Sequence, residues 1–189
     1  MTMQVKRKKD SRVVKCIVHR VADIPGGVTV ETASLGGKAL FEGTPLGKGK
    51  DGLYNVVKTA QIVTAADAAA TAYEVAKGHH FKVGDLFSAG GANGQVISTI
   101  DKSDPAKDVI TLSATLGKAV KVGDTAFESA GANTTLKVQP TVVAGSNWDV
   151  DPDVDNLWVD AWLIGVVRES NAPAVSDAIK SALKGIVYF

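Results

Sequence analysis

The sequence has very little of the chemistry on which thiol and histidine sites depend. Its 189 residues include one cysteine, Cys16, and three histidines. A single cysteine excludes an internal disulfide framework and any metal site built from several cysteines. Because Cys16 lies in the apolar run Val13-Val14-Lys15-Cys16-Ile17-Val18, we expect it to be a small buried core residue. The cysteine content gives no sign of an oxidising compartment, so we expect the protein to be made in a reducing cytoplasm.

Charge and hydropathy do not single out a class of partner either. Lysine and arginine number 21 and aspartate and glutamate 20, which leaves a formal net charge of +1. Overall charge therefore predicts neither a nucleic-acid nor a membrane partner. We expect no membrane span, because no apolar run is long enough, and no signal peptide, because residues 6–9 lead into Asp10-Ser11-Arg12 and not into an apolar segment. A hydrophobic content of 45% is that of a globular protein with a real core.

The sequence does contain a repeated β pattern. Residues 81–85, Phe-Lys-Val-Gly-Asp, lead into the glycine-rich residues 88–93, and residues 120–124, Val-Lys-Val-Gly-Asp, lead into the similar residues 129–133. An apolar run, a tight Gly-Asp corner and a glycine-rich turn are typical of short β-strands. Between the two copies, residues 95–101 and 108–113 alternate and are β-branched, which predicts a β-hairpin.

These patterns predict a mainly β fold with minor α: short antiparallel strands forming a small barrel or sandwich, with one C-terminal helix. Ser176 is the expected N-cap of that helix, and Gly185 is expected to end it. We expect residues 13–63 and 140–189 to form an α+β body, and residues 64–139 to form a barrel-like segment. Residues 157–167 are the most hydrophobic run and predict a central or interface-covered strand.

Two motifs resemble ligand-binding loops but lack the required context. Residues 47–52 match G-x-G-x-x-G, yet a strand-like run follows where a helix should begin, so we interpret them as a hairpin tip. Residues 149–155 resemble a calcium loop, yet Val154 stands where glycine is needed, and Asp160 at the twelfth position is too short. A solvated acidic turn is the favoured interpretation, with bound calcium as the alternative.

Catalytic and metal sites are not predicted. His79 and His80 are neighbours, and adjacent side chains on a strand point to opposite faces, so they do not easily share a metal ion. With three histidines in all, no Ser-His-Asp arrangement can be argued. We therefore expect no enzyme activity, no cofactor and no metal.

Two stretches are predicted to bind other molecules. The first is a basic arm at residues 1–12, and the second is the tryptophan-rich strand near the C-terminus, whose aromatic residues favour a subunit interface. The arm residues are Lys6, Arg7, Lys8, Lys9 and Arg12, and the interface residues are Trp158, Trp162, Leu163 and Ile164.

A known family shares short segments with this chain. They are Asp23-Ile24-Pro25-Gly26-Gly27, Glu42-Gly43-Thr44-Pro45-Leu46-Gly47 and Lys77-Gly78-His79-His80-Phe81-Lys82-Val83-Gly84-Asp85, followed by the hairpin with Ile100-Asp101 and Val109-Ile110-Thr111-Leu112. These segments resemble bacteriophage head fiber or capsid decoration proteins. The resemblance implies a non-enzymatic virion protein that is made in the host cytoplasm and binds the capsid exterior, commonly as a trimer at threefold positions. Its partner would be the major capsid protein.

Three other functions remain open from the sequence. A phage tail or host-attachment protein would look much the same. A nucleic-acid-binding β-barrel would use the basic arm, but it would also need aromatic residues among basic ones, whereas the tryptophans here lie among aspartates. An enzyme with a carboxylate pair drawn from residues 149–160 is the third alternative.

Overall fold

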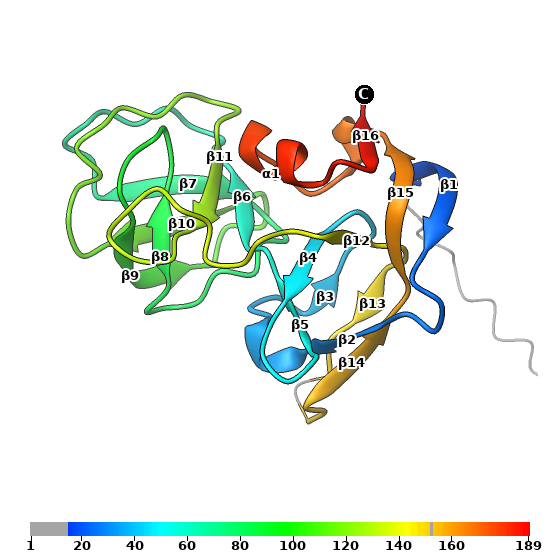
Figure 1. Cartoon of the computed structure of the whole chain (residues 1–189). Helices are drawn as coiled ribbons and strands as arrows, with labels where there is room; N and C mark the ends of the chain where they lie inside the picture. The colour runs from blue at the N-terminus through cyan, green and yellow to red at the C-terminus, as the bar shows by residue number, and fades with distance from the viewer. Residues whose placement is uncertain (1–14, 152) are drawn as a thin grey trace, which may run out of the picture.

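The computed structural model describes residues 15–151 and 153–189, which form two β lobes with a short helix beside their junction (Figure 1). We call the lobe that contains the first and last strands the body, and the lobe formed by the middle of the chain the barrel. No helix in the described residues is long and apolar enough to cross a membrane.

The strands are short, as the frequent turn signals predict. The body contains β1 (Ile17–Asp23), β2 (Val28–Glu31), β3 (Ala39–Leu40), β4 (Pro45–Lys48), β5 (Tyr54–Val56), β12 (Val142–Ala144), β13 (Trp148–Asp149), β14 (Asn156–Val159), β15 (Ala161–Val167) and β16 (Ile186–Tyr188), with the 3-10 turns η1 (Thr32–Ser34) and η2 (Glu169–Asn171) and the helix α1 (Asp177–Ala182). The barrel contains β6 (Thr59–Gln61), β7 (Ala72–Ala76), β8 (Leu86–Ser88), β9 (Gln95–Asp101), β10 (Lys107–Leu112) and β11 (Thr125–Glu128).

The body is built on an eight-stranded sheet in the order β1-β15-β12-β4-β5-β2-β14, with β16 parallel to β15. Only Asp160 separates β14 from β15, so the two ends of this order are drawn together and the sheet curls. Alternation along β2 buries Val28 and Val30 and leaves Thr29 and Glu31 on the other face. Burial of each such apolar side chain contributes about 1.5–3 kcal/mol, so this alternation fixes which face of the strand turns inward.

The barrel is a six-stranded sheet in the order β6-β11-β8-β9-β10-β7. Its first and last strands meet through a bridge between Ile62 and Val75, and the Val63 N–H donates to Glu74 O at 3.0 Å. The sheet therefore closes on itself. Its interior is aromatic: the Phe87 ring lies 5.5 Å from Tyr73 and 5.4 Å from Phe81, centroid to centroid.

The repeated sequence pattern corresponds to a structural repeat within the barrel. Each half has two strands, a Lys-Val-Gly-Asp corner and a third strand: β6, β7 and β8 in the first half, β9, β10 and β11 in the second. Gly84 in the first corner donates to Ile97 O, and Gly123 in the second donates to Ile62 O, both at 2.9 Å. Each corner thus bonds to a strand of the other half, so the halves are interlocked and share one core.

The two corners have the same local geometry. The Asp85 carboxylate accepts from the Lys82 N–H at 2.7 Å, and the Asp124 carboxylate accepts from the Lys121 N–H at 2.8 Å. Gly84 and Gly123 have φ values of 93° and 91°, which a residue with a Cβ rarely adopts. The Gly-Asp pair in each copy therefore stabilises the turn. The glycine adopts the positive φ that the bend requires, and the aspartate carboxylate accepts from the N–H of the lysine three residues earlier.

The C-terminal segment ends against the body. The Ser176 hydroxyl accepts from the Ile179 N–H at 3.4 Å, so Ser176 is the N-cap of α1 as the sequence predicts. Ile179 and Leu183 are buried, and the last strand, β16, pairs with β15. The mainly β fold with a barrel and one C-terminal helix is thus confirmed.

Two details differ from the sequence-based expectations. The run at 157–167 is not one strand, because the chain breaks at Asp160 and the two pieces pair with different partners: β14 with β2, and β15 with β1, β12 and β16. The expected boundary between residues 63 and 64 falls inside the barrel sheet, because β6 already pairs with β11.

Candidate functional site

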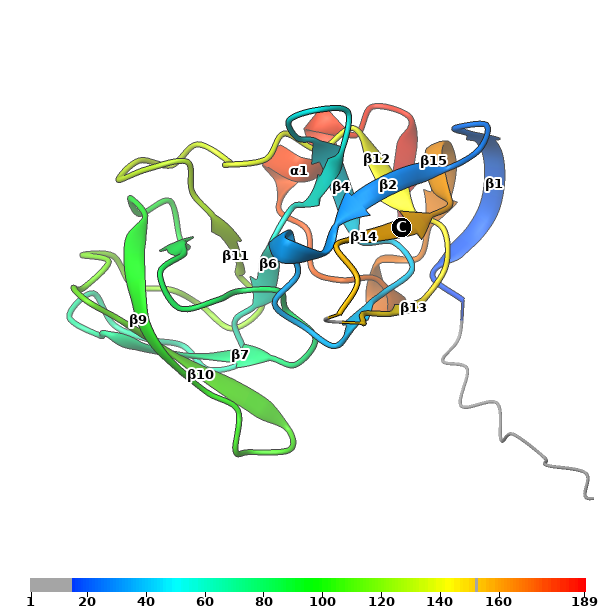
Figure 2. The same cartoon turned by 90° about the horizontal axis from the view of Figure 1, so that it is seen from below.

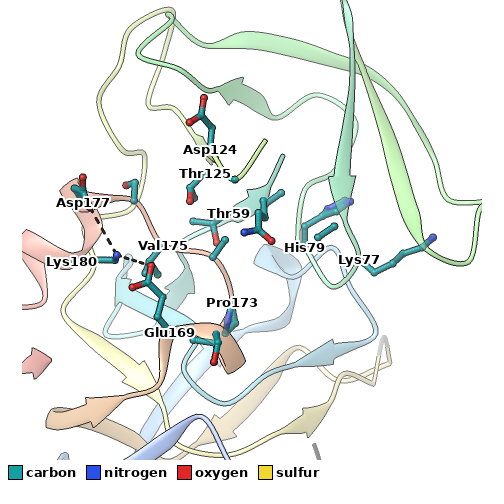
Figure 3. A pocket seen from close by; sticks show the side chains of 18 residues that line it. Thr59, Lys77, His79, Asp124, Thr125, Glu169, Pro173, Val175, Asp177 and Lys180 are labelled. Atoms are coloured by element: carbon teal, nitrogen blue, oxygen red, sulfur yellow. Dashed lines mark hydrogen bonds and ion pairs between the residues drawn. The ribbon is translucent and has the colours of Figure 1, made fainter. Parts of the chain in front are cut away.

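A cleft of about 500 Å³ lies between the barrel and the C-terminal segment (Figure 3). Asp124, Thr125 and Thr59 line it from the barrel, and Glu169 and Lys180 line it from η2 and α1. Lys180 Nζ lies 2.6 Å from Glu169 Oε1, so the lysine is held by its own segment and does not reach across the cleft. The walls are polar and carry charges of both signs, which does not favour one class of small ligand.

One end of the cleft is formed by His79, which contacts a buried carboxylate. Its Nε2 lies 3.1 Å from Asp108 Oδ2, and its Nδ1 accepts from the Phe81 N–H at 3.2 Å. Lys77 Nζ contacts the other oxygen of Asp108 at 2.5 Å. Burial lowers the pKa of His79 to about 4, although Asp108 partly offsets this effect. Both ring nitrogens already face protein groups, so the geometry fits a structural role better than that of a base acting on substrate.

His80 joins the barrel to the body. Its Nδ1 accepts from the Gly37 N–H at 3.2 Å, and its Nε2 is buried with no hydrogen-bond partner among the described residues. A Cβ on Gly36 would lie 2.2 Å from His80 O, so this part of the body approaches the barrel as closely as only glycine allows. Burial, followed by the nearby His79 and Lys58, lowers the pKa of His80 to about 4.

A buried charge network forms a second connection between the lobes. Lys58, in the link between β5 and β6, is 6% exposed, and its Nζ lies 2.7 Å from Asp85 Oδ2 and 3.5 Å from Glu128 Oε2. Lys137 contacts the other oxygen of Glu128 at 2.7 Å. Burial raises the pKa of Glu128, and the two lysines partly offset this effect. The Asp85 carboxylate therefore has two roles: it accepts a hydrogen bond within the first corner, and it pairs with Lys58 at the junction of the lobes.

The structure separates the four residues predicted for a subunit interface. Trp158 packs edge to face on Trp148 at 5.5 Å and is 52% exposed. Trp162 is partly buried in a core cluster of the body, and the Arg20 guanidinium lies over its ring at 5.1 Å. Leu163 and Ile164 are 42% and 45% exposed.

Leu163 and Ile164 are consecutive in β15 and so point to opposite faces of the strand. Both belong to a larger set of exposed apolar side chains on neighbouring strands, which we call the β15 surface. Both β1 and β16 pair with β15, and each adds exposed apolar side chains beside it. The members of the β15 surface are Val18, Val21, Leu163, Ile164, Val187 and Phe189. Sequence reasoning missed four of these six, because β1 and β16 are brought beside β15 by long-range pairings that no local pattern indicates.

The remaining predicted site residues can be placed as follows. The basic arm residues Lys6, Arg7, Lys8, Lys9 and Arg12 lie outside the described residues. Residues 47–52 comprise the end of β4 and the tip of the β4–β5 hairpin, in agreement with the expected hairpin tip. Among residues 15–151 and 153–189, no group of three or more histidine, cysteine, aspartate or glutamate side chains is arranged to hold a metal ion. Comparison of the chain with protein-family models, curated proteins and solved structures found no match.

Proposed function

We propose that this chain is a non-enzymatic virion protein that binds the outer surface of a bacteriophage capsid as a decoration or head fiber protein. In this proposal the β15 surface joins copies of the chain into a trimer, and the basic arm contacts the major capsid protein. The observation that supports it most is the β15 surface itself. Exposed apolar side chains gathered on neighbouring strands are typical of protein–protein contacts.

The position of this surface adds to its support. Among the strands that the structure describes, β1 lies at one end of the body sheet order and pairs only with β15, so none of them pairs with its other edge. An unpaired, partly apolar edge strand favours association with another chain. In the sequence, residues 1–12 end four residues before β1 begins. A trimer would carry three arms, and simultaneous weak contacts add up to durable binding.

We expect the purified protein to be a stable trimer by light scattering at two concentrations, and the double substitution Leu163→Asp/Ile164→Asp to make it monomeric. A carboxylate at the centre of an apolar contact would be buried without a partner when the subunits associate, and the cost of removing it from water would oppose association. Val122→Asp is the matched control, because Val122 is 65% exposed on the barrel corner, away from β15. A wild-type monomer at both concentrations would remove the β15 surface from the proposal.

We expect deletion of residues 1–12 to abolish co-sedimentation with undecorated capsids while leaving the thermal unfolding curve and the oligomer mass unchanged. The deletion removes a cluster of positive charges and none of the residues that the structure describes. Lys48→Ala/Lys50→Ala is the control, since it removes two exposed lysines from the β4–β5 hairpin. Unchanged capsid binding after the deletion would contradict a role for the arm.

The alternative of a nucleic-acid-binding barrel has less support. Bases stack on exposed aromatic side chains, but Tyr73, Phe81 and Phe87 of the barrel are buried in its core. A tail or host-attachment role would use the same fold, and the capsid co-sedimentation experiment distinguishes it from decoration.

A further inference from the structure

Trp158 is an exposed aromatic residue whose indole is held in place. Its Nε1 donates to Gly26 O at 2.6 Å, and its ring packs edge to face on Trp148 at 5.5 Å. A Cβ added to Gly27 would lie 2.9 Å from Trp158 Cε2, so the ring lies directly against the turn between β1 and β2. Despite these contacts Trp158 is 52% exposed. Because the Trp158 side chain is already held in place, stacking of a ligand on it would cost little side-chain conformational entropy.

The side chains on the same sheet face are polar. Strands β14 and β2 lie side by side at one end of the body sheet order (Figures 1 and 2). Trp158 is paired with Thr29, and Asn156 is paired with Glu31, so all four side chains lie on one face while Val28 and Val30 face the core. Asn55, with its amide turned to donate, lies 3.0 Å from Glu31 Oε2 and extends the polar row to β5.

From this arrangement we infer that the outer face of β14 and β2 binds a neutral pyranoside. One face of a pyranose ring presents C–H groups that stack on an indole, while its hydroxyls donate to and accept from amide, hydroxyl and carboxylate groups. Trp158 supplies the stacking surface, and Asn156, Glu31 and Thr29 supply the hydrogen-bonding groups. The inference does not depend on capsid binding, since it uses none of the β15 surface and none of the arm.

The charge around Trp158 sets the class of sugar. Glu31 lies on the binding face, and Asp153 and Asp155 precede β14 on exposed backbone. Carboxylates repel an anionic ligand, and the lysines that line a pocket together with Glu31, among them Lys82 and Lys137, offset part of this repulsion. We therefore expect neutral pyranosides to bind and uronic or sialic acids to be rejected. A protein partner, by contrast, would favour a more apolar surround than this one.

The test is saturation-transfer NMR on the full chain with methyl β-glucoside, galactoside, mannoside and N-acetylglucosaminide, each at up to about 20 mM, a range that detects millimolar dissociation constants. Methyl β-glucuronide is the charged counterpart of the glucoside. At least one neutral glycoside is expected to receive saturation at its ring C–H protons, and the glucuronide is expected to receive none.

Substitutions then place the binding at Trp158. Trp158→Ala is expected to weaken it by about tenfold or more, as loss of an aromatic anchor does. Asn156→Ala, which leaves Trp158 and its contacts in place, is expected to weaken it less but measurably. Val122→Ala is the control, because Val122 is 65% exposed at the second barrel corner and belongs to neither the β14–β2 face nor the β15 surface. Binding of no neutral glycoside, equal binding of the glucuronide, or unchanged binding by both variants would each overturn the inference. A change in oligomer mass on Trp158→Ala would overturn it too, by assigning the indole to a subunit contact.

Discussion

Replacing Lys58 by methionine is expected to destabilise the protein by about 3–5 kcal/mol, the cost of removing one partner from a buried ion pair. The substitution keeps the side chain's length but leaves Asp85 and Glu128 facing each other without the cation between them. Both carboxylate side chains are shielded from water, at 12% and 4% exposure. Urea unfolding at neutral pH measures the loss.

Lys137→Met is the matched control for this experiment. Lys137 contacts the same Glu128 carboxylate, but its side chain is 54% exposed. Surface ion pairs contribute about 0–1 kcal/mol, so this variant should lose much less stability. Adding Glu128→Gln to Lys58→Met should recover part of the loss, because it removes one of the two opposed charges. Equal losses for the two lysine variants would show that burial of Lys58 does not control the strength of the network.

Acidification from pH 7 to pH 4 is expected to cost the protein about 3 kcal/mol or more through His79 and His80, because each unit of pKa shift corresponds to about 1.4 kcal/mol. The pKa of each imidazole is lowered to about 4 in the folded state, against 6.5 for the unperturbed group. Between these two values the unfolded chain binds more protons than the folded one. The stabilisation is therefore fully present above pH 6.5 and is lost as the pH falls through about 4.

The measurement is the slope of unfolding free energy against pH between these limits, for the wild type and for His79→Gln and His80→Gln. Each variant is expected to have a shallower slope, whatever its absolute stability. His19→Gln is the control, since His19 is exposed on β1. Glu128 acts in the opposite sense, because burial raises its pKa and its protonation favours the folded state. A wild-type slope as shallow as that of both variants would contradict this account.

Local sequence patterns predicted the elements well and their long-range partners poorly. Alternating β-branched residues and a polar loop predicted the β9–β10 hairpin, whose strands are neighbours in sequence. The repeated Lys-Val-Gly-Asp corners predicted two equivalent turns. No local pattern could show that the Gly84 N–H donates to Ile97 O in the other half, because the residues around a turn do not indicate which distant carbonyl its N–H will meet.

The candidate site was predictable to a similar extent. Leu163 and Ile164 were chosen for their apolar character, and both are exposed on β15. Trp158 was grouped with Trp162 by proximity in sequence, but the break at Asp160 gives the two indoles different neighbours. The contacts of His79 with Asp108 and of Lys58 with Asp85 were not foreseen, since each joins residues that are distant in sequence.

The position of the barrel within the chain has a further consequence. The chain enters the barrel just after Val57, whose N–H donates to Pro45 O, and it returns beside the same strand, where the Thr141 N–H donates to Leu46 O, both at 2.9 Å. Entry and exit therefore lie next to each other on β4, and the barrel's main core cluster is drawn wholly from residues between them. A foreign domain with adjacent termini could therefore be inserted at this point of the body. Replacing the whole barrel would also remove Leu136 and Phe127 from a core cluster of the body and the two carboxylate partners of the buried Lys58.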